Sequence, residues 1–291
     1  MTAPMRLGLI GRGRWGRNIE RTLLSFPDVS VVMIGRQEAP RSDLDGVLIA
    51  SPSTTHAELA LPYIEAGVAT FIEKPMATSV VEAQRIQAAA ERSHAIVFVG
   101  HIHLYNPAFL AVLELLPKLG TVHYALCESA NGNPRTDCSL LWDWLPHDLS
   151  MGRAIFRADP VSVQAWSLTD GCGSRAAASR YLYGHASFVS LMSWLSPVRR
   201  QRVTITTDKG VVVFDDRAQR KIVLYDETAA ASYPAYDGEL PLSRELRIFL
   251  DAIRSGCVDP SQITLGVGIA QAITAAQESL ACKGAVVKVP R

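Results

Sequence analysis

Residues 6–16 read RLGLIGRGRWG, and this stretch decides the fold of the first part of the chain. The apolar run RLGLI is typical of a buried strand, and glycines follow it at positions 11, 13 and 16. In a βαβ unit that binds a dinucleotide, the first glycine permits the tight turn, the second lets a pyrophosphate approach, and the third lets the helix pack closely. A glycine turn with a structural role alone is the alternative. The predicted binding residues of this loop are Gly11, Arg12, Gly13, Arg14, Trp15 and Gly16.

Strands and helices alternate over the first hundred residues, as in a parallel sheet. From Thr121 the pattern changes to longer alternating strands joined by turns such as TDKG at 207–210. The small and polar run at 170–179 predicts a mobile loop. The sequence therefore predicts an α/β Rossmann domain with a doubly wound sheet over residues 1–119, and an α+β domain of mainly antiparallel sheet flanked by helices over residues 120–291.

The second strand, VSVVMI at 29–34, ends without the acidic residue that would bind a ribose 2′-hydroxyl. Gly35 and Arg36 stand there instead, and a cation at this place fits a 2′-phosphate, so NADP(H) is the favoured cofactor and NAD(H) the second choice. A solvated arginine in a turn is the alternative. Only ten residues, Arg36 to Asp45, separate this strand from the next, and a helix with a third strand would need about twice as many. We therefore expect the adenosine side of the domain to be shortened.

The composition argues against nucleic acid or an anionic membrane as a partner. The 291 residues carry 29 basic and 28 acidic side chains, for a net charge of +1. The five cysteines are scattered and lack the spacing of a metal site, so we predict no metal. No apolar run approaches the roughly 18 residues of a membrane span, and the first residues do not resemble a signal peptide. We expect a soluble, cytoplasmic protein.

The stretch DWLPHD at 143–148 concentrates two carboxylates and a histidine. Asp143 could cap a helix that begins near Leu145, with Pro146 in its first turn, which would make the stretch an ordinary helix start. The same residues could transfer a proton, because the imidazole of His147 has an ordinary pKa near neutrality. These two interpretations are compatible, and the stretch taken alone leaves both open.

Two further stretches carry a resemblance to a known family. FIEKPMA at 71–77 and ASPSTTHAELA at 50–60, together with the glycine loop, resemble the Gfo/Idh/MocA family of NAD(P)-dependent sugar oxidoreductases over nearly the whole chain. The resemblance implies that Lys74 reaches the substrate beside the nicotinamide. It also implies a catalytic Asp four residues before a His, which match Asp143 and His147. The cofactor-binding residues that it adds are Ser51, Pro52, His56, Glu73 and Lys74.

With these residues the resemblance implies oxidation of a secondary alcohol, or the reverse reduction. His147 would take the hydroxyl proton as a general base, because its ordinary pKa suits that role. Lys74 would polarise the oxygen and stabilise the alkoxide charge as it develops. Asp143 would orient the pair or tune its protonation.

The resemblance extends to a branch associated with nucleotide-sugar and polysaccharide biosynthesis, through RTDCSLLWDWLPHDLSM, FVSLMSWLSPVRRQRVTITTDKGVVVFDD and PLSRELRIFLDAI. It implies a UDP-sugar or amino-sugar substrate, with Arg135 as an anion contact. The chain departs from the family in GHIHLYNP, where Leu104 replaces a common arginine. His101 and His103 of this stretch either reshape the pocket or face solvent. The predicted substrate contacts are His101, Tyr105, Asn106, Arg135 and Trp144.

These observations favour an NAD(P)-dependent sugar or nucleotide-sugar dehydrogenase or reductase, which we expect to form a homo-oligomer through its C-terminal sheet. Two alternatives stay open. One is a dinucleotide-binding regulator without turnover, and the other is a non-catalytic partner subunit, which the shortened adenosine side would suit. The joint presence of Lys74, Asp143 and His147 argues against the regulator, since a sensor does not need all three.

Overall fold

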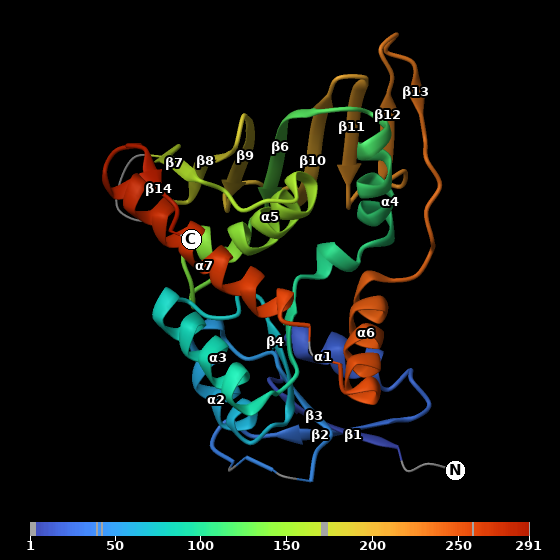
Figure 1. Ribbon diagram of the computed structural model, residues 1–291, viewed down its shortest axis with the longest axis vertical. Helices are drawn as coiled ribbons and strands as arrows, with labels where there is room; N and C mark the ends of the chain where they lie inside the picture. Colours follow the sequence, from blue (N-terminus) through green and yellow to red (C-terminus); the bar gives the residue numbers. More distant parts are fainter. Residues whose placement is uncertain (1–3, 39, 42, 170–173, 258, 291) are drawn as a thin grey trace. The chain divides into compact units, whose positions relative to one another are not determined.

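The computed structural model describes residues 4–38, 40–41, 43–169, 174–257 and 259–290 (Figure 1). The chain divides into two compact units. Unit 1 comprises Met1–Ile102 and Leu240–Ala270, and unit 2 comprises His103–Glu239 and Gln271–Arg291.

Unit 1 is built on a sheet of five parallel strands in the order β2-β1-β3-β4-β5. The order reverses at β1, whose two neighbours are β2 and β3, and ligands of such sheets bind beside this switch point at the carboxyl ends of the strands. This confirms the predicted Rossmann sheet. The strands are β1 (Met5–Ile10), β2 (Val29–Ile34), β3 (Gly46–Ile49), β4 (Ala69–Glu73) and β5 (Val97–Gly100).

The helices of unit 1 follow local signals in the sequence. At the start of α3, the Ser79 hydroxyl caps the helix: it accepts a hydrogen bond from the Glu82 N–H at 3.2 Å and donates one to the Glu82 carboxylate at 3.1 Å. α6 ends at Gly256, whose φ of 64° belongs to the left-handed region. The helices wholly in this unit are α1 (Arg14–Leu23), α2 (His56–Glu65), α3 (Val80–Ser93) and α6 (Pro241–Ser255), with the 3₁₀ turn η1 (Ser53–Thr55).

The link between β2 and β3 contains turns and bends but no helix among its described residues, so the expected shortening is confirmed. The connection bonds to the sheet through Asp45, whose carboxylate accepts the Arg6 N–H at 2.6 Å. The absence of a helix among the described residues of this link leaves the β2 edge of the sheet with less covering than an ordinary βαβ crossover provides.

Unit 2 contains a nine-stranded sheet in the order β13-β12-β11-β10-β6-β9-β8-β7-β14. Its pairings are antiparallel except for the parallel pair of β6 and β9, which confirms the mainly antiparallel sheet. The strands are β6 (Val122–Ala130), β7 (Ser162–Ser167), β8 (Ala176–Tyr183), β9 (Ala186–Ser193), β10 (Arg200–Thr207), β11 (Gly210–Asp215), β12 (Ile222–Tyr225), β13 (Ala231–Ser232) and β14 (Val287–Lys288).

The helical segments of unit 2 include α5 (Leu140–Phe156), which packs on β6, β8 and β9. α4 (Pro107–Leu115) packs on β11, with the rings of Phe109 and Phe214 centred 5.4 Å apart. The 3₁₀ turns η2 (Ile102–Tyr105) and η3 (Leu116–Lys118) flank α4, and α7 (Ser261–Ala281) carries the boundary between the units. In the described ranges, no helix is both long enough and apolar enough to cross a membrane.

Two sequence predictions differ from this arrangement. Residues 103–119 were expected in the first domain but lie in unit 2, because α4 packs on β11. The chain also returns to unit 1 at Leu240, because α6 packs on α1 and its Phe249 ring lies 5.6 Å from that of Phe71. In the predicted loop, residues 170–173 lie outside the described residues and residues 176–179 are strand β8, so the loop is shorter than expected.

Candidate active site

The glycine loop at the start of α1 has the geometry of a dinucleotide site. Gly11 has a φ of +120°, and a Cβ atom there would collide with the Ala50 carbonyl. A Cβ on Gly16 would collide with the Gly11 carbonyl, so the protein itself requires both glycines. A Cβ on Gly13 would meet no protein atom within 4 Å. Gly13 also precedes α1 without a side-chain cap, so the space beside this helix start fits an approaching pyrophosphate.

The end of β2 carries two opposite charges, Arg36 and Glu38. The Glu38 carboxylate folds back and accepts the Gly35 N–H at 2.7 Å. Gly35, Arg36 and Glu38 line a surface pocket together with Glu58 and Leu59. The acidic residue expected of an NAD site is absent at Gly35, directly after β2. Glu38, three residues after Gly35, nevertheless contributes a carboxylate to the same pocket. Nothing in the sequence pattern signalled that this side chain turns back.

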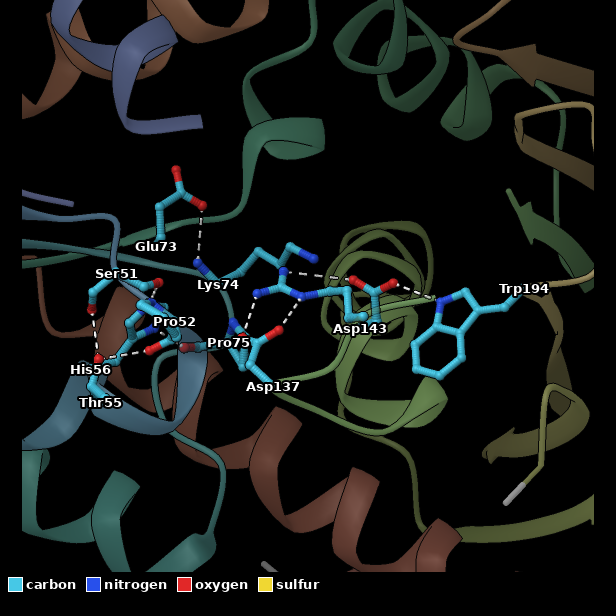
Figure 2. A network of polar contacts seen from close by, with 11 residues as sticks. Ser51, Pro52, Thr55, His56, Glu73, Lys74, Pro75, Asp137, Asp143 and Trp194 are labelled. Atoms are coloured by element: carbon cyan, nitrogen blue, oxygen red, sulfur yellow. Dashed lines mark hydrogen bonds and ion pairs between the residues drawn. The ribbon is translucent and has the colours of Figure 1, made fainter. Parts of the chain in front are cut away.

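The end of β4 links the glycine loop to Lys74 through Glu73, and Figure 2 shows the contact of Glu73 with Lys74. One carboxylate oxygen of the buried Glu73 accepts the indole N–H of Trp15, and the other accepts the Lys74 backbone N–H at 3.2 Å. A Cβ on Gly100 would lie 3.2 Å from the Glu73 carboxyl carbon, so the glycine at the end of β5 makes room for this side chain. Lys74 itself is half-buried. The Glu-Lys pair and the glycine loop thus form one polar assembly within unit 1.

His56 joins two loops beside that assembly (Figure 2). Its Nδ1 lies 2.7 Å from the Pro75 carbonyl oxygen, and its Nε2 lies 3.0 Å from the Ser51 carbonyl oxygen. Both partners are acceptors, so only the imidazolium form can donate to both, whereas a neutral ring satisfies one. The Ser51 and Thr55 hydroxyls lie 2.8 Å apart in the same turn. The role of Ser51, Pro52 and His56 beside a nicotinamide stays a prediction.

A buried glutamate that the sequence analysis did not select lies in the same unit. Glu245 of α6 is completely buried, and neither carboxylate oxygen has a hydrogen-bond partner among the described residues. Burial, and after it the charge of Glu73, raises the pKa of Glu245 well above its usual value. The protonated form is therefore favoured. A glutamate one turn before Phe249, within the apolar stripe of the helix, was the signal that could have found it.

Asp143 lies inside α5 and does not cap it. The helix begins at Leu140, Ser139 stands at the cap position, and the Asp143 N–H donates to the Ser139 carbonyl at 3.0 Å. The prediction of a helix that starts near Leu145 was therefore wrong. Pro146 is tolerated in the helix interior because the residues on either side of it pack into the core of unit 2.

The Asp143 carboxylate is contacted by one group from the segment just before α5 and by one from the segment after β9 (Figure 2). Trp194 donates its indole N–H to Oδ2 at 2.9 Å, and Nη1 of Arg135 lies 3.8 Å from Oδ1. Arg135 is itself paired with both oxygens of Asp137, at 2.9 and 2.6 Å, and this carboxylate raises the pKa of the guanidinium further. A substrate anion at Arg135 would have to compete with Asp137. Sequence reasoning missed Trp194 and Asp137, since 51 residues separate the tryptophan from Asp143.

His147 is half-buried, and its ring makes an edge contact with that of His103, with centroids 5.0 Å apart. His103 is buried and lies against Phe214 at 6.4 Å. His101, which directly follows β5 in unit 1, is only 1% exposed. The alternative in which His101 and His103 face solvent was therefore wrong, because both side chains are buried.

The other predicted substrate contacts are buried in unit 2. Asn106 caps α4, with its carbonyl oxygen accepting the Ala108 N–H at 3.1 Å and its amide donating to Asp216 at 2.8 Å. Both ends of this side chain are thus engaged within the protein. Tyr105 and Trp144 are 8% and 5% exposed. A contact of any of these residues with substrate stays a prediction.

The predicted site residues divide between the two units. Unit 1 carries the glycine loop, Arg36, the residues from Ser51 to His56, Glu73, Lys74 and His101, and unit 2 carries Tyr105, Asn106, Arg135, Asp143, Trp144 and His147. The expected approach of Lys74 to His147 therefore stays a prediction. Among the residues that the structure describes, no group of three or more His, Cys, Asp or Glu side chains gathers as metal ligands do.

Comparison with known proteins agrees with a dinucleotide-binding Rossmann fold in unit 1. Residues 36–101 match the family described as "Oxidoreductase family, NAD-binding Rossmann fold", which is Gfo/Idh/MocA. The UDP-N-acetylglucosamine 3-dehydrogenase of Acidithiobacillus ferrooxidans is 28% identical over 181 residues, which cover 55% of this chain and 57% of that protein. The chain thus spans little more than half the length of this relative.

Solved structures are similar over nearly the whole chain. A protein from Magnetospirillum magnetotacticum MS-1 is 29% identical with a TM-score of 0.84, over 94% of this chain and 99% of that one. An inositol dehydrogenase homolog from Azotobacter vinelandii, complexed with NADH and myo-inositol, has a TM-score of 0.83 at 15% identity over 99% and 98% of the two chains, a likeness of fold alone. The chain is thus similar to Gfo/Idh/MocA oxidoreductases, with the family match limited to residues 36–101, and no branch of that family is established.

Proposed function

We propose that this chain is an NAD(P)-dependent dehydrogenase or reductase that acts on a secondary alcohol or ketone of a sugar-type substrate. The observation that carries the proposal is the glycine loop. It leaves open space beside Gly13 at an uncapped helix start, and Glu73 joins the Trp15 indole of this loop to the backbone of Lys74. The residues present therefore fit a dinucleotide with a reactive lysine in the same unit.

The side chains suggest the following division of labour. Bound NAD(P) would supply a nicotinamide that accepts or donates the hydride. Lys74 would hydrogen-bond the reacting oxygen and stabilise its negative charge as the alkoxide forms. His147 would accept the hydroxyl proton, and Asp143 would orient it while Trp194 and Arg135 hold the carboxylate.

A sugar or cyclitol with several hydroxyl groups is the substrate class that we favour. The relative with 28% identity acts on UDP-N-acetylglucosamine, and the inositol dehydrogenase homolog of the same fold binds myo-inositol. Among these, a nucleotide-sugar is the finer proposal, with its phosphates near Arg135. Arg135 is already paired with Asp137, however, so a phosphate would have to displace that carboxylate. An uncharged polyol, which needs no such contact, is the other member of this substrate class.

Two measurements test the proposal in order. Fluorescence titration with NADH and with NADPH tests binding, and Trp15 beside the glycine loop provides the signal. A turnover screen with NAD⁺ and NADP⁺ over inositols, free sugars and UDP-sugars then tests activity. We expect binding of at least one dinucleotide and turnover of at least one polyol. The absence of dinucleotide binding would overturn the proposal.

One observation favours a second function, a dinucleotide-binding regulator or partner subunit without turnover. The described residues between β2 and β3 form no helix, which reduces the surface available to the adenosine. The screen separates the two functions, because a regulator would bind NADH or NADPH and turn over none of the polyols.

A further inference from the structure

A single buried carboxylate ties α5 to three strands of the sheet in unit 2. Asp148, directly after His147, is completely buried. Its Oδ1 accepts hydrogen bonds from the Ser129 hydroxyl at 2.7 Å, from the Cys127 thiol at 3.3 Å and from the Gln201 amide at 3.4 Å. Its Oδ2 accepts the hydroxyl of Ser190. These donors come from β6, β10 and β9, which are neighbours in the sheet.

The chemistry of this cluster is that of an anchor. Burial raises the pKa of the Asp148 carboxyl, and the hydrogen bonds from Ser129 and Ser190 oppose that rise. An apolar side chain would fill the same space without the cost of burying a carboxyl, so burial alone does not account for an aspartate here. Hydrogen bonds depend on direction, and apolar contacts do not. Apolar contacts alone would let α5 rotate slightly on the sheet, whereas the four donors around Asp148 hold the helix in one orientation.

The anchor lies where the helix is weakest. Pro146 has no N–H, so the hydrogen bond that residue 146 would donate to the Trp142 carbonyl is missing. Asp143, before the proline, is bonded to Trp194, which follows β9. Asp148, after the proline, is bonded to the sheet. Each half of α5 thus has its own polar attachment, one before Pro146 and one after it.

We propose that Asp148 is a positioning residue, which holds His147 and the second half of α5 in place on the sheet. The proposal rests on the proposed function, because it matters for catalysis only if His147 takes part in the reaction. Asp148 touches neither substrate nor cofactor in this scheme and acts through the helix.

The test compares Asp148→Ala, Asp148→Asn and a control, Ser279→Ala, in the full chain. Ser279 is a buried anchor of another helix in the same unit. Its hydroxyl accepts the Ala165 N–H at 2.8 Å and donates to the Ala285 carbonyl at 2.6 Å, which ties α7 to β7. Asn at position 148 keeps an acceptor for Ser129 and can donate to the Ser190 hydroxyl, so it retains the attachment without the charge.

The first readout is hydrogen–deuterium exchange of peptides that cover residues 140–156. We expect Asp148→Ala to speed exchange in this helix by about tenfold or more while the rest of unit 2 stays protected. Asp148→Asn should stay close to wild type, and Ser279→Ala should leave α5 unchanged. Wild-type exchange of α5 in Asp148→Ala, or a loss of protection spread evenly over unit 2, would overturn the proposal.

The second readout is kinetic. For Asp148→Ala we expect kcat to fall by about 10- to 100-fold, the order of loss for a small misplacement of reacting groups, with the KM for the dinucleotide unchanged. Asp148→Asn should restore most of kcat. If it protects α5 but loses kcat as Asp148→Ala does, the charge matters and the positioning role is overturned. If the wild-type chain turns over no polyol, the proposed function fails, and the exchange data alone decide whether Asp148 anchors α5.

Discussion

At the scale of single residues, the partner of each charge decides what it can contribute. Two nitrogens of Arg135 donate hydrogen bonds to Asp137, so fewer donors remain for a substrate anion. Asp143 receives the Trp194 indole and stays an acceptor, which suits the orientation of a base. Because Asp143 does not cap α5, loss of its side chain costs no capping energy, although it removes the acceptor of the buried Trp194 N–H.

Replacement of Lys74 tests the alkoxide role. We expect Lys74→Ala to lower kcat by about 10² or more, the scale for loss of one group that stabilises a developing oxyanion, and to change NADH affinity little. Stopped-flow turnover and fluorescence titration check this, with Lys209→Ala in the β10–β11 turn as the control. Lost NADH binding with intact turnover per bound complex would give Lys74 a docking role instead.

Arg36 and Glu38 are expected to act against each other in the choice of cofactor. A carboxylate in this pocket repels a 2′-phosphate and a guanidinium attracts it. Glu38→Gln should therefore raise the affinity for NADPH relative to NADH by up to about fivefold, since an exposed charge interaction is worth up to about 1 kcal/mol. Arg36→Asp should lower the same ratio. If the ratio of the two dissociation constants is equal in wild type and both variants, neither side chain reads the 2′-position.

At the scale of secondary-structure elements, α5 and α6 both carry a buried carboxyl in an otherwise apolar face. That of α5 has donors from three strands, whereas that of α6 has no hydrogen-bond partner among the described residues. Burial raises the pKa of both groups. Because Asp148 has donors, it attaches α5 to the sheet. Because Glu245 has none among the described residues, it lowers the stability of the folded chain at neutral pH.

Glu245 is expected to make stability depend on pH. Its pKa is higher in the folded than in the unfolded chain, so the unfolded chain releases the proton first, near pH 4, and stability falls as pH rises from there to the folded pKa. Glu245→Gln removes this loss. We expect its Tm to exceed that of wild type at pH 8, with the gap closing towards pH 4. Calorimetry over this range, with the exposed Glu227→Gln as control, checks this, and a gap independent of pH would contradict it.

At the scale of the whole molecule, the glycine loop separates folding from ligand binding. Gly11 and Gly16 are required by contacts within the protein, whereas Gly13 faces open space. A ligand that binds only the folded chain stabilises it, by about 2.7 kcal/mol at a concentration 100 times its Kd. Dinucleotide binding should therefore raise the Tm of the chain, and this rise should depend on the open space beside Gly13 where the pyrophosphate is proposed to bind.

Two alanine variants distinguish these roles. Gly13 has a φ of −66°, which alanine adopts, so Gly13→Ala should keep the Tm of the free protein and lose most of the rise caused by NADH. Gly16→Ala should lower the Tm of the free protein, because overpacking of this kind costs about 1–3 kcal/mol. Thermal unfolding with and without NADH measures both. A full NADH effect in Gly13→Ala would show that the pyrophosphate does not approach there.

The sequence alone determined the parallel sheet of unit 1, the mainly antiparallel sheet of unit 2 and the shortened link after β2. Each depends on neighbours a few residues apart: the spacing of glycines 11, 13 and 16, the alternation of apolar residues along strands, and the ten residues from Arg36 to Asp45. Such signals involve residues close together in the chain, so they can be recognised from the sequence alone. The start of α5 was missed because Pro146 is a strong local signal, and buried contacts on both sides of it outweigh that signal.

Only the tertiary structure decided which polar groups meet. Asp148 finds Ser129, Ser190 and Gln201 across separations of 19, 42 and 53 residues. Glu73 finds Trp15 across 58, and α6 returns to unit 1 after the whole sheet of unit 2. The physical reason is that a hydrogen bond needs its two atoms about 3 Å apart, and strand order and register set that distance between residues remote in the chain. Periodicity identifies the elements, and packing between them selects the partners.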